Sequence, residues 1–125
     1  KTRRFHWNVV GPDFSELHKF FEQQYEALDD IVDEVAERAR ALDVTAAGSL
    51  QEFAKMARIR ELAGANPDPS GMLAALLADH EALIRTLRKD VDAADGLGDA
   101  GTNDFLTGLL EQHEKMAWML RSFLR

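Results

Sequence analysis

Residues 13–42 of the chain read DFSELHKFFEQQYEALDDIVDEVAERARAL, and the helical period of this segment indicates the fold class. Apolar side chains recur along it at helical spacing, which predicts one long helix from about Phe14 to Leu42. The predicted buried stripe of this helix comprises Leu17, Phe21, Leu28, Ile31, Val35 and Leu42. Asp13 is predicted to be the N-cap, and Glu16, three residues later, completes a capping-box pattern.

Helical segments also flank this long helix. The stretch KTRRFHWN ends a helix near Asn8, because glycine and proline follow in VVGPD. So short a segment is a poor independent helix, so we expect its first part to precede this sequence. A short helix is predicted at Leu50–Arg58 inside a long connection, and a third long helix starts at Pro69 behind an Asp68 cap. Apolar positions from Phe105 onward define a fourth helix.

Four main helices with one long connection predict an all-α, ferritin-like four-helix bundle with a short extra helix in the crossover. With 125 residues, the chain forms one domain, residues 1–125. The absence of cysteine excludes a thiolate metal site and suits a reducing cytoplasm. The net charge of -7 disfavours tight binding to phosphate backbones and suits a cationic partner.

One face of the long helix carries Glu22, Asp33 and Glu37. At about 100° per residue, all three lie on the same side as His18 and away from the apolar stripe. At about 1.5 Å per residue, however, His18 and Asp33 are about 22 Å apart, which is too far for one metal ion. The helix therefore carries two half-sites, which a second, antiparallel copy would bring together twice about a two-fold axis. His6 can fold back to join His18.

Two imidazoles and three carboxylates suit iron, manganese or zinc. A site inside one bundle would need Glu-x-x-His motifs on two helices, and the sequence contains none. Glu26 and Asp29 share the same face, however, so a solvated acidic surface remains an alternative, which periodicity alone favours. His80 and His113 interrupt apolar stripes, and we interpret them as core or bundle-edge histidines with local hydrogen-bond partners.

The run KTRRFHWNVVGPDFSELHKFFEQQYEALDDIVDEVAERARAL, residues 1–42, resembles the signature region of the Dps family, the ferritin-like DNA-binding proteins from starved cells. DPSGMLAALLADHEALIRTLR and GTNDFLTGLLEQHEKMAWMLRSFL resemble the third and fourth helices of that family. The resemblance implies a cytoplasmic, in some members nucleoid-associated, shell of twelve subunits. It also implies oxidation of ferrous iron, preferably by hydrogen peroxide, storage of ferric mineral and protection of DNA from oxidative damage.

In that family the ferroxidase site lies between two-fold-related subunits, and the ligand positions match His6, His18, Asp33 and Glu37. Glu22 stands where many members have Asp, and its longer side chain places the carboxylate differently. Trp7 matches a tryptophan beside the site that the family uses to absorb oxidising equivalents. A buried aromatic anchor is the alternative role for Trp7.

The segment DAADGLGDAGTNDF, residues 92–105, offers three carboxylates where the three-fold pores of the family are acidic. These are Asp95, Asp99 and Asp104, of which Asp104, in a matching TND segment, is favoured as pore-lining. Ala100 occupies a position that can be acidic in relatives. The alternative roles are loop solubility for Asp99 and placement in the first turn of a helix for Asp104.

Two other functions stay open at this point. One is a structural DNA-compacting protein with little iron chemistry, although the lysine- or arginine-rich tail that serves this role in many members is not seen here. The other is a shell whose site prefers zinc or manganese, since zinc competes strongly with ferrous iron for such ligands.

Overall fold

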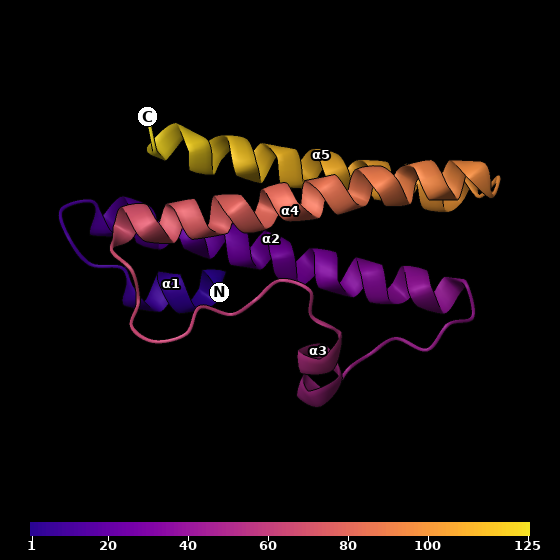
Figure 1. The fold of residues 1–125 in the computed structure, drawn as a ribbon, viewed down its shortest axis with the longest axis horizontal. Coiled ribbons are helices and arrows are strands. Elements are labelled where there is room, and N and C mark those ends of the chain that lie inside the picture. The colour runs from indigo at the N-terminus through magenta and orange to yellow at the C-terminus, as the bar shows by residue number, and fades with distance from the viewer.

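The fold consists of five helices and no strands, and the computed structural model of the chain describes residues 1–125. In chain order the helices are α1 (Thr2–Asn8), α2 (Phe14–Ala41), α3 (Leu50–Met56), α4 (Pro69–Gly96) and α5 (Ala100–Phe123). Figure 1 shows α1, α2, α4 and α5 running lengthwise together, whereas α3 projects from the crossover. The prediction of an all-α, ferritin-like bundle with a short extra helix in the crossover is therefore confirmed.

The predicted start of α4 is correct. The Asp68 side chain accepts a hydrogen bond from the backbone N–H of Gly71, and Pro69 occupies the first turn. Proline suits that position because the first N–H groups of a helix have no partner within the helix. The predicted end of α3 is two residues too late, since α3 ends at Met56.

The capping box predicted at the start of α2 is wrong. Asp13 is the N-cap residue, but its φ of -94° and ψ of 17° are not extended, and its side chain accepts no capping bond. A capping box occurs instead in α3, where Ser49 and Glu52 each accept from the backbone N–H of the other.

The largest core cluster lies at the end of the bundle where α1, α2, α4 and α5 meet. Its buried members are Phe5, Val9, Leu17, Phe20, Phe21, Met72, Leu73, Leu76 and Leu120. A second, smaller cluster further along the bundle joins α2 to α5 and comprises Ile31, Leu109 and Met116. The most extensive helix pairing is between α4 and α5, followed by α1 and α2.

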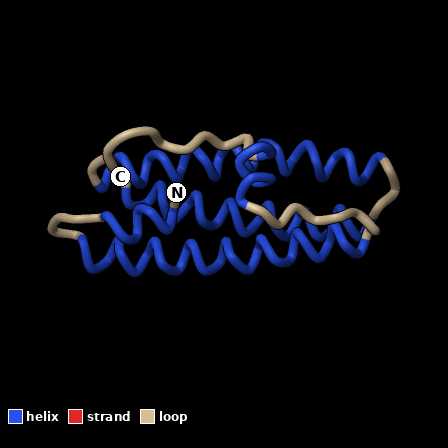
Figure 2. The backbone as a smooth tube through the Cα atoms, turned by 90° about the horizontal axis from the view of Figure 1, so that it is seen from below, coloured by secondary structure: helices blue, strands red, loops and turns tan.

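Part of the predicted buried stripe on α2 is wrong, because Val35 and Leu42 are exposed and Leu28 is only half-buried. α1 is short, and Arg3 of α1 pairs with Asp29, near the middle of α2. Beyond that point, α2 and the crossover form an open apolar groove of about 600 Å³ that includes Val35. In the view of Figure 2, the crossover carrying α3 follows the outside of the bundle.

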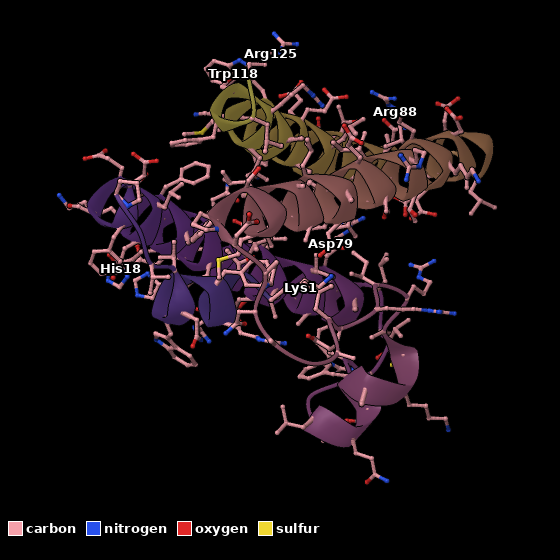
Figure 3. All side chains as sticks on the ribbon, turned by 60° about the vertical axis from the view of Figure 1, so that its left-hand side comes forward. Lys1, His18, Asp79, Arg88, Trp118 and Arg125 are labelled. Atoms are coloured by element: carbon pink, nitrogen blue, oxygen red, sulfur yellow. The ribbon has the colours of Figure 1, made fainter.

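Arg4 ties α1 to the crossover segment just before α4. Its Nε donates to the Asn66 side-chain oxygen at 2.7 Å, and its two terminal nitrogens donate to the carbonyls of Leu62 and Gly64 at 2.8 and 2.9 Å. An ion pair of 2.6 Å between Lys1 and Asp79 adds a direct link from the start of α1 to α4; Figure 3 labels both residues. These contacts fix α1, which carries His6. None of the helices combines the length and apolar composition needed to cross a membrane.

Candidate metal site

The central feature of the candidate site is a stacked pair of imidazoles, His6 from α1 and His18 from α2. The ring centroids are 3.8 Å apart and the ring planes differ by 20°. Nδ1 of each ring lies 2.8 Å from the backbone carbonyl oxygen of the other histidine. A carbonyl oxygen only accepts, so each Nδ1 carries the hydrogen, and a lone pair for a metal can then come only from Nε2.

This arrangement sets the tautomer of both histidines before any metal arrives. Metal-binding histidines in proteins usually donate one ring N–H to a carbonyl or carboxylate, which orients the ring and makes the other nitrogen a better ligand. His6 and His18 meet this condition reciprocally. The pair is therefore suited to present two nitrogen ligands.

The turn between α1 and α2 explains how two residues twelve positions apart come together. Val9 is 1% exposed and anchors the start of the turn in the core. Gly11 has a φ of +116°, which side chains of L-residues rarely tolerate, and it allows the chain to reverse. α1 and the first half of α2 consequently pack against each other.

Three residues that the sequence analysis did not assign to the site hold His6 in place. The guanidinium of Arg3 forms an ion pair with Asp29 and lies 4.6 Å above the centroid of the Tyr25 ring. Tyr25 in turn packs edge-on against His6, with centroids 5.3 Å apart. Asp29 therefore does more than contribute to a solvated acidic face. The spacing of Arg3 and His6, one turn apart on α1, was the available signal.

Glu22 lies half-buried beside this aromatic group. Partial burial raises the pKa of the Tyr25 hydroxyl, and the negative charges of Glu22 and Glu26 raise it further. Tyr25 therefore stays protonated at neutral pH and can donate a hydrogen bond toward Glu22.

The structure brings His6 and His18 into contact and places Glu22 one turn beyond His18 on α2, but it leaves Asp33 and Glu37 apart from them. Both of these carboxylates are exposed further along α2, and Figure 3 shows His18 near the opposite, N-terminal end of that helix. Within one chain, no three His, Asp or Glu side chains are close enough to hold one metal ion. A single subunit thus presents two separate groups of predicted metal ligands.

Trp7 lies next to His6 in the sequence, and 69% of its surface is exposed. A buried aromatic anchor, the alternative role considered for Trp7, is therefore wrong for the single subunit. The indole is accessible at the surface near the imidazole pair.

The carboxylates near the turn between α4 and α5 differ in how they are engaged. Asp99 caps α5 by accepting from the Thr102 backbone N–H at 3.0 Å and from its hydroxyl, and it forms an ion pair of 3.4 Å with Arg38. The hydrogen bonds from Thr102, and to a lesser extent the charge of Arg38, lower the pKa of Asp99. Asp99 is therefore a structural cap rather than an unengaged loop carboxylate.

Asp95 and Asp104 are exposed and form no ion pair within the chain. α5 begins at Ala100, so Asp104 lies beyond the first turn, and the first-turn placement considered for it is wrong.

His80 of α4 and His113 of α5 form a second imidazole pair, deep in the bundle. Both are about 97% buried, and their Nδ1 atoms are 2.9 Å apart, so one ring donates and the other accepts. Burial lowers the pKa of His80 to about 4 and also lowers that of His113. The interpretation of both as core histidines with a local partner is confirmed, and each is the partner of the other.

Comparisons with known proteins identify the family of the chain. The ferritin-like domain family matches residues 1–125. A low-temperature-induced protein from Nostoc is 50% identical over 125 residues, covering 99% of this chain and 70% of the relative. DNA protection during starvation protein 2 from Bacillus anthracis is 36% identical, covering 99% of this chain and 84% of the relative.

Among solved structures, Dps from Thermosynechococcus elongatus superposes with a TM-score of 0.95 at 32% identity, covering 99% of this chain and 78% of that one. Dps from Bacillus brevis superposes with a TM-score of 0.95 at 33% identity, covering 100% and 83%. The chain belongs to the ferritin-like family and, within it, to the Dps proteins.

Proposed function

We propose that the protein oxidises ferrous iron at sites that two subunits share and stores the ferric product. In each site, His6, His18 and Glu22 of one subunit would face Asp33 and Glu37 of a two-fold partner. The observation that carries this proposal is the reciprocal hydrogen bonding of His6 and His18, which leaves Nε2 of both rings available as a ligand. Membership of the Dps proteins supports the two-fold arrangement.

The donor set suits the reaction because its carboxylates and its imidazoles favour different oxidation states of iron. Carboxylate oxygens are hard, anionic ligands that stabilise ferric iron relative to ferrous iron, whereas neutral imidazoles bind the incoming ferrous ion without adding negative charge. Hydrogen peroxide is the proposed oxidant: two ferrous ions each give up one electron, peroxide takes up both with two protons, and two water molecules form. Because peroxide receives two electrons, no hydroxyl radical is released.

Glu22 and Trp7 have supporting roles in this proposal. Tyr25 is three residues from Glu22 on the same helix, so its hydroxyl would donate to the Glu22 carboxylate and orient it toward the metal. Trp7 is exposed next to His6 and would donate an electron when oxidant exceeds iron. Zinc and manganese would compete with iron for the same donors.

Iron has to enter the interior of the proposed twelve-subunit cage. Asp104 is exposed and unpaired, and we propose that it lines the three-fold pore with Asp95. Asp99 would lie nearby, but its bonds to Thr102 and Arg38 reduce its capacity to attract cations. A cytoplasmic location is part of the same proposal.

Protection of DNA, after which the Bacillus anthracis relative is named, would follow here from the removal of iron and peroxide. Direct compaction of DNA is the alternative function. The net charge of -7 opposes it, because a negatively charged chain is repelled by the phosphate backbone of DNA.

The experiment adds ferrous iron anaerobically to the purified protein and then supplies either hydrogen peroxide or dioxygen. We expect faster oxidation with peroxide, two ferrous ions consumed per peroxide, and less spin-trapped hydroxyl radical than in buffer. Preloading with zinc should slow the reaction. Oxidation no faster than in protein-free buffer, or an undiminished radical signal, would refute the proposal.

A further inference from the structure

A groove between α4 and α5 carries a pattern of charges that the proposed iron chemistry does not use. It has a volume of about 490 Å³, and we call it the arginine groove. Its floor is apolar, formed by Ile84 and Ala117, which are 7% and 1% exposed. The charged residues that line it are Glu81, Arg85, Arg88, Glu114 and Arg121. Figure 3 labels Arg88, which projects from the outer side of the paired helices.

Two ion pairs cross the arginine groove and fix four of its side chains. Arg121 donates to Glu81 at 3.0 Å, and Arg88 donates to Glu114 at 2.6 Å. The two pairs are seven residues apart on each helix, which is two helical turns, so they mark the ends of one continuous strip.

Arg85 lies between these two ion pairs and has no carboxylate partner. The antiparallel register that pairs Glu81 with Arg121, and Arg88 with Glu114, places Ala117 across from Arg85. A carboxylate at that position would complete a third ion pair, but a buried methyl group stands there instead. Arg85 is also one turn from Arg88, and like charges at this spacing repel each other.

The groove therefore has one more positive than negative side chain, although the whole chain carries a net charge of -7. Each guanidinium has five N–H donors in a planar fork, and the cross-groove contacts use only one nitrogen of Arg88 and one of Arg121. The groove consequently holds N–H donors that its two carboxylates do not engage.

We propose that the arginine groove binds a small tetrahedral oxyanion of the phosphate class, with Arg85 as its main ligand. The anion takes the place of the missing third carboxylate and relieves the repulsion between Arg85 and Arg88. The two existing ion pairs already order Arg88 and Arg121, so little side-chain entropy is lost when they contribute further donors. The site is separate from the proposed iron site and does not depend on it.

The test is calorimetric titration of inorganic phosphate into iron-free, assembled protein at constant ionic strength, because surface electrostatics depend on salt. We expect saturable binding to the wild type and binding at least about tenfold weaker to Arg85→Gln, which corresponds to about 1.4 kcal/mol. Arg58→Gln is the matched control: it removes the same charge from an exposed arginine outside the groove, and it should bind phosphate like the wild type.

Thermal unfolding provides a second readout that does not require a calorimetric signal. Phosphate should raise the melting temperature of the wild type and Arg58→Gln more than that of Arg85→Gln, because a ligand stabilises only the state that binds it.

Absence of saturable binding by the wild type, or equal affinity in Arg85→Gln, would overturn the proposal. Tighter binding of dimethyl phosphate than of inorganic phosphate would also overturn it, because the groove would then recognise an esterified phosphate on a larger molecule. A change of assembly state in Arg85→Gln without phosphate binding by the wild type would assign the groove to a neighbouring subunit instead.

Discussion

Replacement of Asp33 by alanine is expected to slow peroxide-driven oxidation of ferrous iron roughly 100-fold. Removal of a residue that merely supports a metal ligand costs about 10- to 100-fold, so loss of a proposed ligand should reach at least the upper end of that range. The Asp33 side chain is exposed, and its removal should leave the free energy of unfolding within about 0.5 kcal/mol of wild type. Stopped-flow absorbance of the ferric product measures the rate, and chemical denaturation measures the stability.

Glu34→Ala is the matched control for Asp33→Ala. Glu34 is the next residue on α2, equally exposed and equally charged, but about 100° further round the helix and outside both half-sites. Its replacement should leave the oxidation rate close to wild type. Equal rates for Asp33→Ala and Glu34→Ala would show that Asp33 has no specific role, and the acidic face would then be the solvated surface that periodicity alone favours.

Acidification from pH 6.5 to pH 4 is expected to destabilise the bundle through the buried pair of His80 and His113. The pKa of His80 is about 4 in the folded chain, below the ordinary value of 6.5, so the unfolded chain takes up its proton first as the pH falls. The contribution of His80 to the free energy of unfolding is therefore fully present above pH 6.5, and it is lost as the pH falls toward 4. For His80 alone, a shift of this size corresponds to roughly 3 kcal/mol.

No nearby carboxylate is free to stabilise a positive charge on His80 or His113. On α4, Asp79 is bound to Lys1 and Glu81 to Arg121, and on α5 Glu114 is bound to Arg88. No carboxylate therefore raises the pKa of His80, which is lowered by burial and by the proximity of His113.

The control for this prediction is the double variant His80→Leu, His113→Leu. Denaturation curves at a series of pH values should show that wild type loses more stability than the double variant between pH 6.5 and 4. Parallel pH profiles would contradict the prediction. His113→Leu alone should be less stable than the double variant at neutral pH, because it leaves the buried Nδ1 of His80 without a partner.

The fold could be predicted from the sequence because its signals are local. Gly11, the Asp68–Pro69 pair and the helical period of α2 each act over a few residues, and each marks an element where the structure has one. The reverse turn that brings His6 back to His18 was likewise predictable from a local signal, the glycine and proline at positions 11 and 12. Their role as metal ligands, together with that of Glu22, Asp33 and Glu37, stays a prediction.

What the sequence analysis missed depends on contacts between distant residues. The ion pair of Arg3 with Asp29 joins residues 26 apart, and the imidazole contact within the bundle joins residues 33 apart. The bond from Arg38 to Asp99 spans 61 residues, so no local pattern marked that contact, whereas the cap that Asp99 forms with Thr102, three residues later, was a local signal that the sequence analysis missed. The exposure of Val35 and Leu42 has a similar cause: periodicity identifies the apolar side of a helix but not how far along it a neighbour extends.

The claim that each iron site is shared by two subunits is tested most directly by mixing two inactive variants. His18→Ala and Asp33→Ala each remove one half of every site, so each protein alone should be nearly inactive. In a hybrid dimer, one site receives both defects and the other receives neither, because a two-fold interface forms the same site twice. Co-assembly from equal amounts should therefore restore roughly a quarter of the wild-type oxidation rate, since about half of the dimers are hybrids with one intact site. A mixture that stays as inactive as its components would contradict the shared site.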